Sequence, residues 1–182
     1  HPSERARSAR EPIPPGGASP VAEVARVLDT SSAADLAAEL AIVAHSLPRE
    51  WPQDVLEEAR KYGQKVRSTD LQGRVDLRNL PLVTIDGEDA RDFDDAVYSE
   101  PARGGWRLVV AIADVSHYVP VGSALDREAA LRATSVYFPD RVLPMLPEAL
   151  SNELCSLKPE VERLAMVCDM RVNTKGQVSH SR

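Results

Sequence analysis

The chain has few of the features of secreted, membrane-spanning or zinc-binding proteins. Its two cysteines, Cys155 and Cys168, are too few for a disulfide framework, so free thiols in a reducing compartment are expected. Its longest apolar run, Leu108–Ala113, is far shorter than the ~20 residues of a membrane helix. None of its four histidines has a cysteine or histidine at zinc-ligand spacing. These absences predict a soluble cytoplasmic protein with no membrane partner.

Two common catalytic signatures are also missing. The sequence has neither a G-x-S-x-G nucleophile elbow nor a glycine-rich phosphate loop. The formal net charge of −6 at pH 7 gives no basic footprint for nucleic acid over the whole chain, although a local groove in an acidic protein can still be basic. Any chemistry must therefore come from a different set of residues.

What the chain does have is one dense acidic segment. Residues 86–95 hold six acidic side chains and one arginine, so they carry −5 of the net charge of −6. Apolar residues flank this segment on both sides, which a solvated acidic tail would not need. Because neighbouring carboxylates repel one another, a folded chain that gathers them usually binds a hard divalent cation.

The spacing within the segment selects four aspartates. Asp92 and Asp94 have strand spacing, so their side chains share one face about 7 Å apart at Cα. Asp95 joins them only if the backbone bends, and Gly87 permits a reversal that would bring Asp86 back beside them. These four carboxylates are candidate ligands for one or two Mg²⁺ ions, and an acidic surface loop is the alternative.

Two other metal motifs fit the segment poorly. In an EF-hand loop that starts at Asp86, Arg91 would occupy the glycine position and Val97 would replace the bidentate glutamate. In an Asp-x-Asp phosphatase signature, the acids would follow a strand, whereas Asp92 and Asp94 stand at the start of the expected one.

Three residues further along are candidates for substrate binding. His117 follows an expected buried strand, and a turn histidine without a function is its ordinary alternative. Tyr137 could stack on a nucleobase, which is worth ~1–3 kcal/mol per base in single-strand binders, although such an aromatic is more often part of a core. Arg141 could hold a phosphate group.

Composition divides the chain into three parts. Residues 1–20 are rich in proline and are expected to form a disordered linker. Residues 21–75 contain two helical patterns, which stop at Pro48 and Gly63. Residues 76–182 alternate mainly like strands, the first of them expected over Phe93–Ser99, with hairpin turns expected at 102–105 and 173–176. A further helix is expected over 124–133 and a helical turn within 146–157. This order predicts an α+β fold behind a helical lead-in.

The part from Leu80 to Pro159 resembles the catalytic domain of the ribonuclease II and ribonuclease R family. The blocks that carry the resemblance are TID at 84–86, DFDDA at 92–96, AIADVSHYV at 111–119, TSVYFP at 134–139, PMLP at 144–147, LSN at 150–152 and LCSL at 154–157. The third and fourth blocks are more similar to the ribonuclease R branch. Residues 21–52 resemble that family's passage from its second cold-shock domain into the catalytic domain.

This resemblance implies an RNB-type catalytic domain, a mixed sheet flanked by helices, with residues 76–182 as its amino-terminal part and residues 21–75 as the end of a cold-shock domain and a connector. It implies a monomeric parent enzyme that is a processive, hydrolytic 3′→5′ exoribonuclease. Such an enzyme depends on Mg²⁺, takes the single-stranded 3′ end of RNA, and releases nucleoside 5′-monophosphates.

The family's site residues can be carried over one at a time. Asp86 and Asp95 match direct ligands of the two Mg²⁺ ions, and Asp92 matches the aspartate that completes the shell. Asp94 matches the aspartate most needed for cleavage, so Asp92 and Asp94 are the catalytic candidates. Tyr137 matches the aromatic that stacks on the nucleotide near the 3′ end.

Some of the family's pattern is missing from these residues. The arginine and further aromatic that complete the active site, and the S1 domain, would lie beyond Arg182. The chain is therefore expected to be a fragment that holds the metal ligands, and an inactive fragment is one outcome. Two alternatives remain: a non-catalytic RNA- or partner-binding remnant, and a Mg²⁺-dependent phosphohydrolase on another scaffold.

Overall fold

A computed structural model describes residues 33–88 and 90–182, which divide into two compact units. Among these residues, the first unit comprises 33–48 together with Tyr137–Val142, and the second comprises 49–136 and 143–182 without residue 89. The linker expected over 1–20 and the first residues of the part expected over 21–75 lie outside the described residues.

The first unit contains the helix α1 (Ala33–Ala44) and the tip of a short hairpin between β3 (Val136–Tyr137) and β4 (Val142–Leu143). The helix forms where alanine and leucine dominate, because these residues lose little freedom in a helix. It buries Ala38 and Ile42, and it ends before Pro48, as the sequence predicts.

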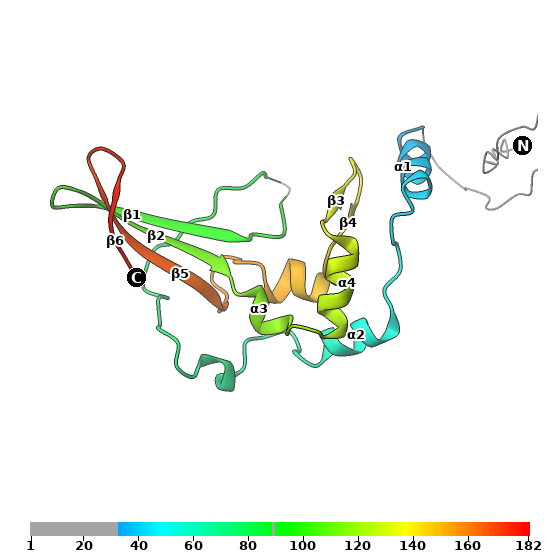
Figure 1. The fold of residues 1–182 in the computed structure, drawn as a ribbon, viewed down its shortest axis with the longest axis horizontal. Coiled ribbons are helices and arrows are strands. Elements are labelled where there is room, and N and C mark those ends of the chain that lie inside the picture. The colour runs from blue at the N-terminus through cyan, green and yellow to red at the C-terminus, as the bar shows by residue number, and fades with distance from the viewer. Residues whose placement is uncertain (1–32, 89) are drawn as a thin grey trace, which may run out of the picture. The chain divides into compact units, whose positions relative to one another are not determined.

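The second unit is built on a four-stranded sheet in the order β1-β2-β5-β6 (Figure 1). Its strands are β1 (Asp95–Ala102), β2 (Gly105–Ala113), β5 (Ala165–Asn173) and β6 (Val178–Ser181). Each pairing in this sheet is antiparallel, whereas the family resemblance implied a mixed sheet. Tight turns join β1 to β2 and β5 to β6, and such turns can connect only antiparallel neighbours.

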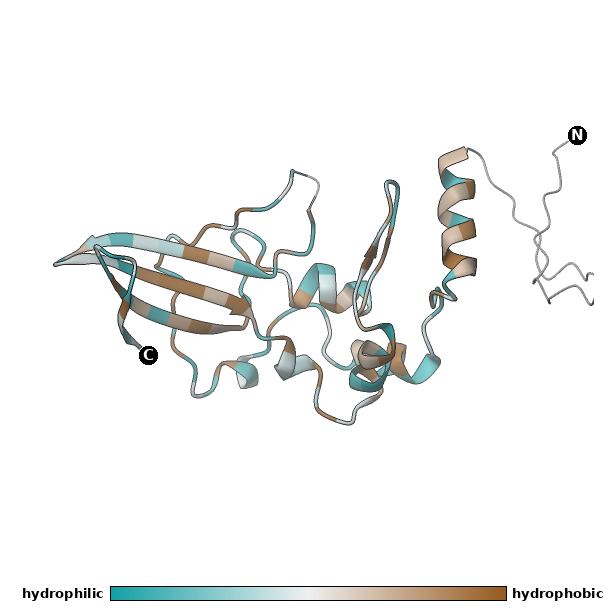
Figure 2. Ribbon diagram, turned by 45° about the horizontal axis from the view of Figure 1, so that its top comes forward, coloured by the Kyte–Doolittle hydropathy of each residue, from teal (hydrophilic) through white to brown (hydrophobic). Residues whose placement is uncertain are grey.

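Apolar residues, brown in Figure 2, are spread along the strands of the sheet between more polar ones. On one face Val109 and Ala111 of β2 are almost fully buried. On the other face Trp106 and Ile112 of the same strand remain about half exposed, at 51% and 47%. Side chains of a strand alternate between the two faces, so β2 gives one buried and one partly uncovered apolar row.

Short helices make up much of the rest of the second unit. They are α2 (Gln53–Arg60), the 3₁₀ turn η1 (Ser68–Leu71), α3 (Val115–Tyr118), α4 (Ala124–Arg132) and the π-type turn η2 (Ala149–Leu154). The sequence predicted α2, α4 and a helical turn near η2, but it missed η1 and α3, each of which has only four residues. No helix in residues 33–88 or 90–182 combines the length and the apolar character needed to cross a membrane.

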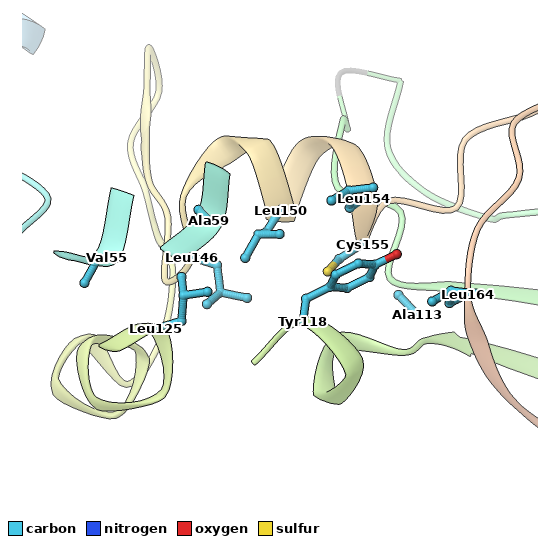
Figure 3. Close-up of a cluster of buried hydrophobic side chains, with 10 residues drawn as sticks. All are labelled: Val55, Ala59, Ala113, Tyr118, Leu125, Leu146, Leu150, Leu154, Cys155 and Leu164. Atoms are coloured by element: carbon cyan, nitrogen blue, oxygen red, sulfur yellow. The ribbon is translucent and has the colours of Figure 1, made fainter. Parts of the chain in front are cut away.

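The core of the second unit lies between these helices and the end of the sheet. Leucines of α4 and η2 meet side chains of α2, α3 and β2 there (Figure 3). The cluster contains Val55, Ala59, Ala113, Tyr118, Leu125, Leu146, Leu150, Leu154, Cys155 and Leu164. The free thiol of Cys155 is buried, and burial raises its pKa to about 12, so it is an inert core residue.

Polar contacts hold α2 and α4 together at the edge of this core. The Ser123 hydroxyl caps α4 by accepting from the Asp126 amide at 3.1 Å, and Glu58 of α2 accepts from the Leu125 amide at 3.0 Å. The Arg132 guanidinium lies 3.6 Å from the centre of the Trp51 ring and pairs with Glu128. Arg132 is therefore a packing residue of this unit.

We expect Leu150→Ala to lower the free energy of unfolding by about 2–5 kcal/mol, because Leu150 is fully buried and its removal leaves a cavity. Leu131→Ala is the matched control, since this leucine is 73% exposed and should cost less than about 0.5 kcal/mol. Urea denaturation followed by circular dichroism measures both. Equal effects of the two substitutions would contradict the described core.

Candidate active site

The acidic segment is a loop whose two ends are tied together. Val83 and Val97 form an antiparallel bridge, with N–H···O distances of 2.9 and 2.8 Å. Within the loop, the amide of Ala90 donates to the carbonyl of Gly87 at 3.0 Å. The reversal predicted from the sequence is present, but it depends on this bridge and turn, because Gly87 does not adopt a positive φ.

The second half of the loop leads directly into the sheet. Strand β1 begins at Asp95, two residues later than predicted from the sequence, and Asp95 is in register with Ile112. The carbonyl of Asp94 accepts a hydrogen bond from the amide of Ala113 at 2.8 Å. Asp94 and Asp95 are therefore attached to the rigid sheet, while Asp92 stands just before it.

The structure gathers the four aspartates that the sequence selected. The pKa of Asp94 is raised, first because its carboxylate is partly desolvated and then because the carboxylates of Asp92, Asp95 and Asp86 lie near it. Asp94 is still an exposed residue, so solvent screens part of this repulsion.

This donor set fits Mg²⁺ by its chemistry. A hard cation prefers carboxylate oxygens, and a positive charge would reverse the repulsion that raises the pKa of Asp94. The four carboxylates are nevertheless not as close together as the ligands of a bound ion. Among residues 33–88 and 90–182, no three acidic, histidine or cysteine side chains lie close enough to hold a metal ion together. Asp86, Asp92, Asp94 and Asp95 therefore remain predicted ligands.

His117 lies away from this loop in a network of charged side chains. It belongs to α3, and its Nε2 lies 3.4 Å from Oδ1 of Asp70, which is an ion-pair distance if the imidazole is protonated. Its ring also packs edge-on against Tyr118, with the ring centres 4.9 Å apart. In the part of the chain that the structure describes, this Nε2 has no hydrogen-bond partner.

An ion pair that sequence reasoning missed supports the turn after β2. The Arg74 guanidinium donates to the buried carboxylate of Asp114 at 2.7 Å, and the Ser116 hydroxyl donates to it at 2.7 Å. Burial raises the pKa of Asp114, but the hydrogen bonds from Ser116 and Arg74, the charge of Arg74 and the amide of His117 together lower it overall. Arg74 and Asp114 are forty residues apart, so no local pattern could have revealed the pair.

Tyr137 and Arg141 belong to the first unit. The side chain of Tyr137 is 63% exposed, so it is not the core aromatic that was its alternative. Arg141 forms ion pairs with Asp35, with the buried Glu39 at 3.0 Å, and with Asp140 at 2.8 Å. Its guanidinium is thus engaged by three carboxylates, which a phosphate group would have to displace.

A cavity of about 810 Å³ lies beside the base of the acidic loop, lined in part by Thr84, Ala96 and Leu157. The basic residues along its wall already have acceptors. Arg78 pairs with Asp76 and Glu162, Lys158 pairs with Glu153, and Arg163 donates to the carbonyl of Ser156. The cavity therefore offers mainly apolar surface and no uncommitted anion site.

Comparison with known proteins identifies the domain. The family model of the RNB domain matches residues 74–182, which is more than half of the chain. The chain belongs to the RNB family. This result confirms the resemblance drawn from the sequence blocks, and all four aspartates lie within the matched residues.

Individual RNB relatives are similar over most of this chain. Ribonuclease R of Escherichia coli (strain K12) is 56% identical over 160 residues, which cover 87% of this chain and 20% of that protein. Ribonuclease R of Acidithiobacillus ferrooxidans is 52% identical over 164 residues, covering 90% and 37%. The structure of Mycoplasma genitalium RNase R in complex with double-stranded RNA has a TM-score of 0.79 at 34% identity, covering 87% and 28%. The chain thus spans less than half of each relative, and the α+β fold is shared.

Because Asp94 sits among like charges, we expect Asp94→Asn to raise the free energy of unfolding at pH 7 without metal, by less than about 1 kcal/mol after solvent screening. Because the pKa of Asp94 is raised in the folded protein, its charged carboxylate destabilises the fold at pH values above the folded-state pKa. This destabilisation vanishes below the pKa of the unfolded chain, near 3.9, where the carboxyl group is protonated in both states. Urea denaturation in a chelator at pH 7 and at pH 4 should show the two proteins converging at the lower pH.

The control for this measurement is Asp54→Asn, which changes an exposed aspartate of α2 outside the loop and should not raise stability. An Asp94→Asn protein that is less stable than the wild type at pH 7 would show that the carboxylates do not repel one another.

Proposed function

We propose that this chain is part of a Mg²⁺-dependent, processive 3′→5′ exoribonuclease, in which Asp86, Asp92, Asp94 and Asp95 bind the metal. The observation that carries the proposal is the gathering of these four carboxylates in a loop of an RNB domain, where partial burial and their mutual repulsion raise the pKa of Asp94. A solvated surface loop would have no reason to be tied at Val83 and Val97 and to bring its acids together.

RNA is the proposed substrate. Two similar solved structures are Mycoplasma genitalium RNase R in complex with ribose-methylated single-stranded RNA and with double-stranded RNA. We assign the single-stranded 3′ end as the reacting part, with nucleoside 5′-monophosphates as products. A cytoplasmic location and a monomeric parent enzyme are part of the same proposal.

The reaction divides between the metal and the side chains of this chain. When bound, two Mg²⁺ ions would neutralise the scissile phosphate and activate the attacking water. Asp86 and Asp95 are assigned to direct ligation from the two ends of the loop. Asp92 would complete the ligand set, and Asp94 is assigned to hold the ion that would activate the attacking water. The backbone of Asp94 is hydrogen-bonded to β2, which would fix the position of this ligand.

Substrate contacts are proposed for residues outside the loop. Tyr137 is exposed and is assigned to stack on a base near the 3′ end. His117 and Arg141 would first have to leave their carboxylate neighbours to contact RNA, so any contact they make would depend on that exchange.

In the longer protein that contains this chain, we expect Asp94→Asn to reduce the rate of RNA hydrolysis by at least about 100-fold while RNA binding is kept, because the loss falls on metal-assisted chemistry. The assay uses uniformly labelled, 3′-extended single-stranded RNA, with Mg²⁺ and with a chelator. Chromatography of the products should show nucleoside 5′-monophosphates only with Mg²⁺.

Asp54→Asn serves as the control and should keep the wild-type rate. Unchanged hydrolysis by Asp94→Asn would overturn the assigned role. RNA binding without monophosphate release by the unaltered protein would favour the non-catalytic RNA-binding alternative, and hydrolysis of small phosphate esters but not RNA would favour a phosphohydrolase.

A further inference from the structure

Ser156 is fully buried, and its side chain contacts the acidic loop directly. Its hydroxyl donates to the carbonyl of Arg91 at 2.7 Å and accepts from the amide of Phe93 at 3.1 Å. These two backbone groups stand on either side of Asp92. The sequence places Ser156 more than sixty residues after them, so only the folded chain makes this contact.

The two hydrogen bonds repeat the pattern of a parallel strand. Between two parallel strands, a residue donates its amide to the carbonyl of the residue that precedes its neighbour on the other strand. Its own carbonyl accepts from the amide of the residue that follows that neighbour. The hydroxyl of Ser156 does both for Asp92. The next amide, that of Leu157, donates to the carbonyl of Phe93 at 2.8 Å and extends the pairing. The backbone around Asp92 and Asp94 is thus held although it lies outside the sheet.

Ser156 is itself held from two sides. Its amide donates to the carbonyl of Glu153 at 3.1 Å, which places it at the end of η2. Its carbonyl accepts from Nε of Arg163 at 2.9 Å, and the Arg163 side chain is only 6% exposed. Since η2 contributes Leu150 and Leu154 to the core, the hydroxyl connects the core to the acidic loop.

We propose that Ser156 is a positioning residue for the metal site: its hydroxyl sets the backbone of residues 91–93, and so the carboxylates of Asp92 and Asp94, for binding a divalent cation. This inference rests on the proposed function. Outer groups that orient metal ligands typically change metal affinity by about 10–100-fold when they are removed. If Ser156 were buried only for packing, its substitution would lower the stability of the protein but would leave the metal affinity of the folded protein unchanged.

The test uses this chain and Mn²⁺ as a spectroscopic substitute for Mg²⁺, with free Mn²⁺ measured by electron paramagnetic resonance. We expect Ser156→Ala to weaken Mn²⁺ binding about 10-fold, since both loop groups lose their partner. In Ser156→Cys the thiol fills the space of the hydroxyl but forms weaker hydrogen bonds, so we expect a smaller loss of Mn²⁺ affinity. This variant replaces Ser156→Ala if the alanine variant does not fold. Thermal unfolding is recorded for each variant.

Ser123→Ala is the matched control, because this serine also bonds a backbone amide but caps α4 far along the chain from the loop. It should lower the melting temperature and leave Mn²⁺ affinity within about twofold. Two results would overturn the positioning role of Ser156 but not the proposed metal site. One is wild-type Mn²⁺ affinity in both Ser156→Ala and Ser156→Cys, and the other is a loss of Mn²⁺ affinity in Ser123→Ala as large as that in Ser156→Ala. Absence of Mn²⁺ binding by the unaltered chain at about 10 mM, well above usual carboxylate sites, would overturn the proposed metal site as well.

Discussion

Mutual repulsion among four carboxylates is the constraint on which this part of the molecule depends. A loop containing Asp86, Asp92, Asp94 and Asp95 would spread apart if only side chains decided its shape. Neutral backbone hydrogen bonds hold it instead, at the bridge between Val83 and Val97 and at the bond from Ala113 to Asp94. Each such bond contributes about 0.5–1.5 kcal/mol, so several together can offset repulsion that solvent already screens.

Elsewhere in the second unit, several acidic side chains are paired with arginines. Arg67 donates hydrogen bonds to Asp70 and lowers its pKa to about 2, and Arg107 does the same for Asp169. These carboxylates are held in their charged form by neighbouring arginines. The pKa of Asp94 shifts the opposite way, because its carboxylate is partly buried and lies near those of Asp92, Asp95 and Asp86. That contrast, more than the number of acids, supports an external cation.

The hydrophobic core and the acidic loop are parts of one arrangement. Leu150 and Leu154 anchor η2, and Ser156 follows it within two residues, so packing in the core decides where the hydroxyl meets the loop. From the other side, β2 places Ala113 against Asp94 because its apolar residues are buried in the sheet. The site is therefore as rigid as the elements that surround it, although most of its own residues are exposed.

Local patterns in the sequence were enough to predict α1, α2, α4, the hairpins β1–β2 and β5–β6 and the four aspartates, because helix stops, turn residues and charge density act over a few positions. They failed for η1 and α3, which are too short for a period, and for the start of β1. The contacts of Ser156 with the loop, and of Arg74 with Asp114, join residues forty or more positions apart. Only tertiary packing decides such pairs, because a buried donor or acceptor takes whichever partner the fold brings within hydrogen-bonding distance.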